Sequence, residues 1–245
     1  MKVQLVSDLH LEYQKDWGVD LLKSIEPKGD ILVLAGDITY ANHSMLDIVF
    51  NYTSHNWDNV VYIPGNHEFY NHNSIIEGWK VIKEVASRYP NIYALNNELV
   101  DIEGACLVYG GTGWFPPEHF KQLRKNISDF NQIKDVVPEA YNSNKDFKQM
   151  FDFYSKEGKI PNGPDLIVTH HLPDERCVAP QYKNDLLNQY FVSQFDVEYF
   201  NPKYWLHGHT HSPVNLKISN TQVLANPRGY KGENPNWTSD FVFEV

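Results

Sequence analysis

Five short motifs in the sequence place potential metal ligands directly after apolar segments. They are Asp8-Leu9-His10, Gly36-Asp37, Gly65-Asn66-His67-Glu68, Thr169-His170-His171 and Gly208-His209-Thr210-His211. The first four follow the strand-like runs VQLVS, DILVLA, VVYIP and DLIVT, and the fifth follows KYWLH. Because parallel strands deliver their carboxyl ends to one edge of a sheet, we expect these side chains to lie together.

The types and spacing of these residues indicate a metal site. In an extended segment, residues two apart point to the same side, so Asp8 and His10 are expected to face inward together. The same spacing applies to His209 and His211. Carboxylate, amide and imidazole ligands favour Mn, Fe, Zn or Co over Ca, and the motifs contain no thiolate that would select Zn strongly. One such motif alone is typical of an ordinary turn, so the prediction depends on all of them occurring together.

Together and in this order, the motifs resemble those of the calcineurin-like metallophosphoesterases, including small bacterial members, from the N-terminus to about residue 211. The resemblance implies an α/β fold in which two mixed β-sheets pack as a sandwich with helices on the outer faces. It also implies two divalent metal ions (Mn, Fe, Zn or Co). The first would be bound by Asp8, His10, Asp37 and His211. The second would be bound by Asp37, Asn66, His170 and His209, with Asp37 bridging the two.

The resemblance assigns the catalytic role to His67, beside the metals. Two ions about 3.5–4 Å apart can polarise a phosphoryl group and lower the pKa of a bridging water toward neutrality. His67 would protonate the leaving oxygen or stabilise the phosphoryl oxygens. The implied activity is the hydrolysis of small phosphomonoesters or phosphodiesters by a metal-bridging hydroxide. The alternative role for His67 is that of a turn histidine at the start of the next helix.

Two other functions remain open, a nuclease of the same fold and a metal-binding scaffold without catalysis. The net charge of −10, from 21 basic and 31 acidic residues, argues against a nucleic-acid partner and favours a small phosphorylated substrate. A scaffold without catalysis would normally lack some metal ligands or the catalytic histidine. In this sequence His67 and a suitable residue at each of the seven ligand positions are present. The physiological ester, the native metals and the oligomeric state are left open.

Some neighbouring residues have weaker assignments. Tyr40 and Tyr230 could form aromatic walls for the substrate. Arg228, within a segment that resembles a C-terminal motif of bacterial metallophosphoesterases, could bind a phosphate or form an ordinary surface ion pair. Glu68 is expected to support the site from outside or to begin a helix. His171 should face away from the ligands and either support them or pack in the core.

The composition is typical of a soluble enzyme with a single domain over residues 1–245. The hydrophobic share is 42%, and no linker rich in Pro, Gly or Ser divides the chain. No apolar run approaches the roughly 18–20 residues needed to span a membrane, and no secretory signal is evident. Cys106 and Cys177 are not spaced as a metal-binding pair. A cytoplasmic location without membrane contact is therefore expected.

Strand and helix signals alternate along most of the chain. Strands are expected at about 2–7, 31–35, 60–63, 92–95, 98–102, 105–110, 166–169, 203–206, 214–219, 222–226 and 241–244. Helices are expected at 44–56, 74–88 and about 143–157. The last lies in a polar, aromatic insertion at about 114–164, flanked by strands that lead to the site. We expect this insertion to form a cap over the site or a helical surface packed on the sheet.

Overall fold

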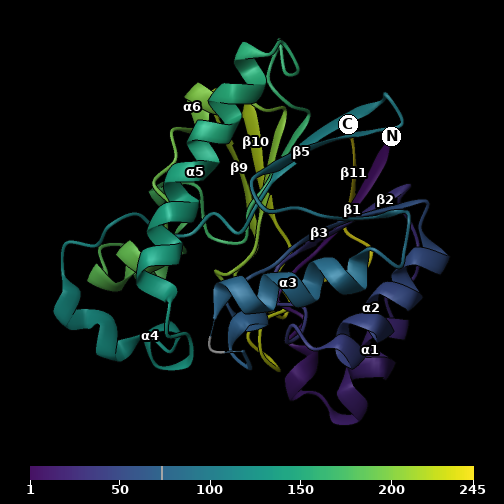
Figure 1. Ribbon diagram of the computed structural model, residues 1–245, viewed down its shortest axis with the longest axis horizontal. Coiled ribbons are helices and arrows are strands. Elements are labelled where there is room, and N and C mark those ends of the chain that lie inside the picture. Colours follow the sequence, from purple (N-terminus) through teal and green to yellow (C-terminus); the bar gives the residue numbers. More distant parts are fainter. Residues whose placement is uncertain (73) are drawn as a thin grey trace.

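The computed structural model describes residues 1–72 and 74–245, which form two β-sheets with helices outside them (Figure 1). The first sheet has the strand order β11-β1-β2-β3-β4. Its strands are β1 (Lys2–Val6), β2 (Ile31–Ala35), β3 (Asn59–Ile63), β4 (Ile92–Ala94) and β11 (Val242–Glu244). The chain ends lie side by side, because β11 pairs with β1.

The second sheet has the strand order β5-β6-β7-β8-β10-β9. Its strands are β5 (Glu98–Ile102), β6 (Cys106–Gly110), β7 (Leu166–Val168), β8 (Tyr204–His207), β9 (Val214–Ile218) and β10 (Thr221–Ala225). Strands β1 to β4 are parallel, as are β6, β7, β8 and β10, while β11, β5 and β9 pair antiparallel. The loops after the parallel strands of each sheet therefore leave from one edge of that sheet.

The two sheets pack against each other through an apolar layer. Leu5, Val33 and Val61 contribute to it from the first sheet, and Val108 and Leu206 contribute from the second. All five of these side chains are fully buried. Strands covered on both faces need nearly continuous apolar sequence, which explains runs such as ILVLA in β2.

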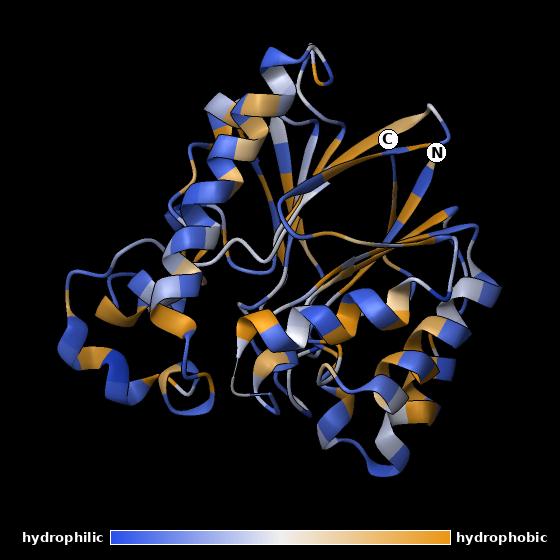
Figure 2. Cartoon of the chain, in the orientation of Figure 1, coloured by the Kyte–Doolittle hydropathy of each residue, from blue (hydrophilic) through white to orange (hydrophobic). Residues whose placement is uncertain are grey.

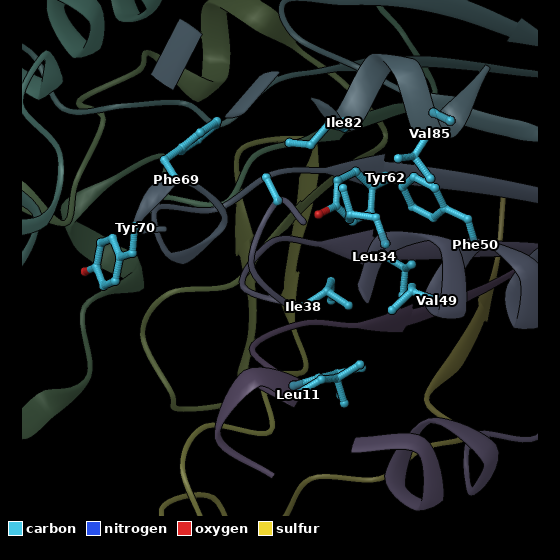
Figure 3. Close-up of a cluster of buried hydrophobic side chains, with 14 of the residues drawn as sticks. Leu11, Leu34, Ile38, Val49, Phe50, Tyr62, Phe69, Tyr70, Ile82 and Val85 are labelled. Atoms are coloured by element: carbon cyan, nitrogen blue, oxygen red, sulfur yellow. The ribbon is translucent and has the colours of Figure 1, made fainter. Parts of the chain in front are cut away.

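Three helices cover the outer face of the first sheet: α1 (Val19–Lys23), α2 (His43–Asn56) and α3 (Ile75–Ala86). Figure 3 shows Phe50 of α2 and Ile82 of α3 packed beside Tyr62 of β3, within a cluster of buried side chains. Figure 2 shows apolar and polar residues alternating along these helices, as expected for helices with one buried face. The Ser74 side chain begins α3 by accepting a hydrogen bond from the Glu77 N–H.

The helices α4 (Asp129–Gln132), α5 (Val136–Lys156) and α6 (Val197–Phe200) belong to the second half of the chain. Phe147 of α5 packs on the second sheet against Tyr109 and Trp205 and is fully buried. Short 3-10 helices complete the described structure. They are η1 (Leu11–Tyr13), η2 (Lys15–Gly18), η3 (His67–Phe69), η4 (Lys121–Asn126), η5 (Glu175–Cys177), η6 (Pro180–Tyr182) and η7 (Leu186–Tyr190).

The predicted sandwich of two mixed sheets is confirmed, and each predicted strand coincides with an observed one to within one residue at either end. The predicted start of the last helix at about residue 143 is wrong, because α5 already begins at Val136. Pro138 lies in its first turn, where a backbone N–H is not needed for helical hydrogen bonding. In the part of the chain that the structure describes, no helix is both long and apolar enough to cross a membrane.

Candidate active site

The loops that follow β1, β2, β3, β7 and β8 meet at one place and carry the predicted metal ligands. Asp8 Oδ1 lies 3.0 Å from the His209 backbone nitrogen and 3.3 Å from His211 Nε2. Asp37 Oδ2 lies 3.8 Å from His10 Nε2, and Asp37 Oδ1 lies 3.4 Å from His170 Nε2. Residues from both halves of the sequence are thus brought together.

Three residues of each predicted ligand set lie close together. Ligand atoms of Asp8, His10 and His211 lie within 4.8 Å of one another, and so do those of Asp37, His170 and His209. Asn66 lines the same cavity as Asp37 and His209. The structure therefore brings the seven predicted ligand residues to one site.

Two buried polar atoms of the predicted ligands lack a hydrogen-bond partner among the described residues, although one of them lies 3.4 Å from Asp37 Oδ1. They are Asn66 Oδ1 and His170 Nε2. The opposite atom of each side chain is engaged, since Asn66 Nδ2 donates to Asp129 and His170 Nδ1 lies 2.9 Å from the Ala35 carbonyl oxygen. An unsatisfied buried polar atom costs about 1–3 kcal/mol, and a divalent cation would satisfy both. The donor set therefore fits the metal ions that the sequence predicts.

The titratable groups of the site shift one another's pKa values. Burial alone would raise the pKa of Asp37, but the charges of His170 and His67 hold it well below its ordinary value. Burial opposes protonation of His170, yet the Asp37 carboxylate raises its pKa to about 10, so metal binding would release that proton. Burial and the neighbouring His171 lower the pKa of His209 well below its ordinary value, which leaves a neutral imidazole.

From their spacing, the segments that carry Asp8 and His10, and His209 and His211, are expected to be extended. That expectation is wrong. Asp8 and His10 have φ of 54° and 48°, and His209 and His211 have φ of 65° and 48°. The backbone of Asp37 is also in the left-handed region, with φ of 53°. Such backbone conformations cost about 1–3 kcal/mol each in non-glycine residues and tend to cluster at functional sites. Left-handed turns after the strands, instead of strand alternation, therefore bring the ligands together.

Glu68 ties together the loops after β2 and β3. Its carboxylate accepts hydrogen bonds from the backbone N–H groups of Asp37, Ile38 and Gly65 and from the Tyr62 hydroxyl, at 2.8–3.0 Å. Burial and the nearby Asp37 carboxylate raise the pKa of Glu68 to about 7. The residue thus supports the site from outside by fixing the backbone that carries Asp37.

Glu12 is a residue of this site that the sequence analysis missed. Its Oε1 lies 3.2 Å from His10 Nδ1 and 3.2 Å from His67 Nδ1, and its side chain is 1% exposed. Burial alone would raise the pKa of Glu12, but hydrogen bonds from His10 and His67 lower it below its ordinary value. Its position two residues after His10 was the available signal, because it extends the spacing of Asp8 and His10.

Asp129 is a second such residue and comes from the insertion. It accepts hydrogen bonds from Asn66 Nδ2 at 2.8 Å and from the Tyr70 hydroxyl at 2.6 Å. These bonds orient the Asn66 amide so that Oδ1 is left for another partner. The available signal was its place in the sequence Ser128-Asp129-Phe130, an acidic residue between a hydroxyl and an aromatic residue in the insertion.

His67 is held at one ring nitrogen and faces the cavity with the other. Nδ1 contacts Glu12, while Nε2 lies 3.4 Å from the Tyr230 hydroxyl oxygen and 3.9 Å from Asp37 Oδ2. The Tyr70 ring packs on its imidazole with ring centroids 4.3 Å apart. Burial alone would lower the pKa of His67, but the charges of Asp37 and Glu12 raise it above its ordinary value.

A cavity of about 410 Å³ adjoins these residues. Tyr230 lines it, as do Asn126 and Ser128 of the insertion. Tyr40 and Arg228 are not among the described residues that line it. The Tyr40 hydroxyl lies 3.3 Å from the Tyr13 hydroxyl, and the Arg228 guanidinium donates to the carbonyl oxygens of Leu9 and Gly229.

His171 and His207 lie behind the ligands in the protein interior. Both are fully buried. The His171 ring packs on Trp114 and His209, with centroid distances of 4.9 and 4.4 Å, and burial lowers its pKa to about 3. Burial also lowers the pKa of His207 to about 4. Both histidines are therefore neutral packing residues.

Comparison with known proteins agrees with this geometry. The sequence profile of the calcineurin-like phosphoesterases matches residues 1–213. The protein therefore belongs to the calcineurin-like phosphoesterase family, and this membership indicates a hydrolase that acts on phosphoesters.

Individual proteins resemble this chain in sequence or in fold. "Uncharacterized protein L509" of Acanthamoeba polyphaga mimivirus is 29% identical over 262 residues, which cover 96% of this chain and 93% of the viral protein. Phosphopantetheinyl Hydrolase (PptH) from Mycobacterium tuberculosis has a similar structure, with a TM-score of 0.65, 14% identity and coverage of 95% and 90% of the two chains. TT1561 of Thermus thermophilus gives a TM-score of 0.53 and 14% identity, over 92% and 88% of the chains. The solved structures are similar in fold.

Proposed function

We propose that the protein hydrolyses phosphomonoesters or phosphodiesters of small molecules with the help of two divalent metal ions. Asp8, His10, Asp37 and His211 would bind one ion, and Asp37, Asn66, His170 and His209 would bind the other. The proposal rests on the two neighbouring ligand groups, which Asp37 Oδ2 links by lying 3.8 Å from His10 Nε2, together with the unsatisfied Asn66 Oδ1 and His170 Nε2.

Bound metal ions of this kind polarise phosphoryl oxygens and lower the pKa of coordinated water. The protein's own residues orient the ligands and supply a proton. Glu12 holds His10, and Glu233 Oε2 holds His211 at 2.6 Å from Nδ1. With Nδ1 fixed by Glu12, His67 can give a proton from Nε2 to the leaving-group oxygen in the cavity.

A test of this role compares His67→Ala with the parent protein after loading with Mn²⁺. General acid catalysis is worth about 10²–10⁴-fold, and we expect a loss of that order for an alkyl phosphate ester. The loss should be smaller for a 4-nitrophenyl ester, because its leaving oxygen departs without a proton. Bound Mn²⁺, measured by elemental analysis, should be unchanged.

His43→Ala provides the control, because His43 lies on α2 and contacts Glu84 at the surface. It should leave both rates unchanged. Equal losses for both esters in His67→Ala would assign His67 to stabilising the phosphoryl oxygens. Undiminished rates would remove His67 from the mechanism, and failure of the parent protein to cleave any ester would favour the scaffold alternative.

A further inference from the structure

Part of the lining of the cavity beside the candidate metal ligands is an apolar wall, and polar residues of the same chain segment line the cavity as well. This wall consists of Leu172, Val178, Ala179, Leu187 and Phe191, all from the segment between β7 and β8. The Phe191 ring packs on the imidazole of His209, with centroids 4.6 Å apart. The apolar wall is therefore continuous with the site at which the phosphoryl group would be bound.

Outside the histidines of the candidate site, the rest of the cavity offers no positive side chain to a substrate. None of the described residues that line it is Lys or Arg. The carboxylates of the lining outside the predicted ligand set are Asp129, Asp185 and Glu233. Asp185 is exposed at the N-terminus of η7, where it accepts a hydrogen bond from the Leu187 N–H. A second anionic group on the substrate would meet these carboxylates without a compensating cation, at a cost in binding.

The polar groups of the lining are mostly neutral hydrogen-bonding groups. Asn126 and Ser128 contribute from the insertion, and Tyr182 and Asn188 contribute from the segment that forms the apolar wall. Arg228, the remaining candidate for a second phosphate, donates to backbone carbonyl oxygens instead. The lining therefore suits a group with a long apolar part and at most neutral polar atoms.

From this lining we infer that the substrate is an ester with a single phosphate, whose organic group is uncharged and largely apolar and packs against Leu172, Val178, Ala179, Leu187 and Phe191. The inference rests on the proposed phosphoester hydrolysis and specifies its substrate class. Nucleoside polyphosphates and esters that carry further carboxylates are disfavoured substrates.

The test measures binding of four phosphonates to the Mn²⁺-loaded protein by calorimetry. They carry methyl, 5-phenylpentyl, 5-carboxypentyl and 5-ammoniopentyl groups, and their P–C bond resists hydrolysis. The phenylpentyl compound should bind about tenfold or more tightly than methylphosphonate, since it buries apolar surface that the methyl group lacks. The carboxypentyl compound should bind least well among the long ligands.

Two neighbouring leucines allow a matched pair of variants. Leu187 lines the cavity and is half-buried, whereas Leu186 is 55% exposed and is not part of the lining. Leu187→Lys should weaken binding of the phenylpentyl compound and strengthen that of the carboxypentyl compound, which changes their ratio by about tenfold. Leu186→Lys should leave the ratio within about twofold of the parent value.

The outcomes separate this inference from the proposed function. Equal binding of the four phosphonates, tightest binding of a charged one, or no binding at all would overturn the inference. The ligand series uses the parent protein, so the result stands even if a variant fails to fold. If the phosphonates bind in the expected order but no ester is hydrolysed, the proposed hydrolysis fails while the assignment of the pocket is retained.

Discussion

At the scale of single residues, Glu12 connects a predicted metal ligand with the predicted acid. One carboxylate oxygen contacts both His10 Nδ1 and His67 Nδ1 from a buried position. Both rings are thereby fixed with Nε2 turned to the opposite side, where Asp37 lies within 4 Å of each. Glu12 is thus a positioning residue that acts through two histidines.

Glu12→Gln should lower kcat about 10–100-fold and change KM little, because supporting hydrogen bonds to ligands have effects of that size. The exposed Glu26→Gln serves as the control and should behave like the parent protein. If Glu12 acts by holding His67, the substitution should cost much less in a His67→Ala background. Losses that simply add in the double variant, measured by steady-state kinetics, would contradict this role.

The sequence predicted the candidate ligands and the supporting role of Glu68, but not the supporting roles of Glu12 and Glu233. Asp8, Asp37 and His170 could be recognised because each follows a buried strand, and strand ends have a defined place in a parallel sheet. Glu12 lies in the short 3-10 helix η1 and Glu233 lies in a turn, and the contacts of both depend on the local backbone conformation. The left-handed Asp8 and His10 have the same cause, since residue types alone do not encode a positive φ outside glycine.

At the scale of elements, apolar periodicity predicted the position of α5 better than its length. Phe147, Met150, Phe151 and Tyr154 are spaced three and four apart and marked the second half of the helix. The first turns contain Pro138 and are separated from Phe147 by the polar residues 142–146, which interrupt the apolar pattern. The helical conformation of these turns depends on tertiary packing. Val136 and Ala140 are buried members of the same hydrophobic cluster as Trp114.

Phe147 anchors α5 to the second sheet, and its loss should be costly. Its ring is fully buried and packs against Phe195 and Tyr109 with centroid distances of 4.6 and 4.7 Å. Phe147→Ala should lower the free energy of unfolding by about 3–5 kcal/mol, as large-to-small substitutions in cores do. Phe153→Ala on the same helix, where the ring is 47% exposed, should cost less than about 1 kcal/mol. Similar midpoints for both variants in urea unfolding would contradict this packing.

At the scale of the whole molecule, the candidate site joins the two sheets. Asp8 follows β1 of the first sheet and contacts His209, which follows β8 of the second. Asp37 and His170 likewise come from opposite sheets. Because this site concentrates buried carboxylates and imidazoles from residues far apart in sequence, a metal bound there would hold the sandwich closed at this edge.

Removal of metal should therefore destabilise the whole protein. A ligand at about 1,000 times its Kd stabilises the folded state by roughly 4 kcal/mol, which corresponds to about 10 °C in Tm for a protein of this size. We expect EDTA to lower the Tm of the Mn²⁺-loaded protein by about that amount, as measured by circular dichroism. Asp37→Ala removes the only residue proposed to bind both ions, so its Tm should respond weakly to Mn²⁺ and EDTA. A Tm of the parent protein that is insensitive to both, or an unchanged response in Asp37→Ala, would show that this cluster is not the metal site.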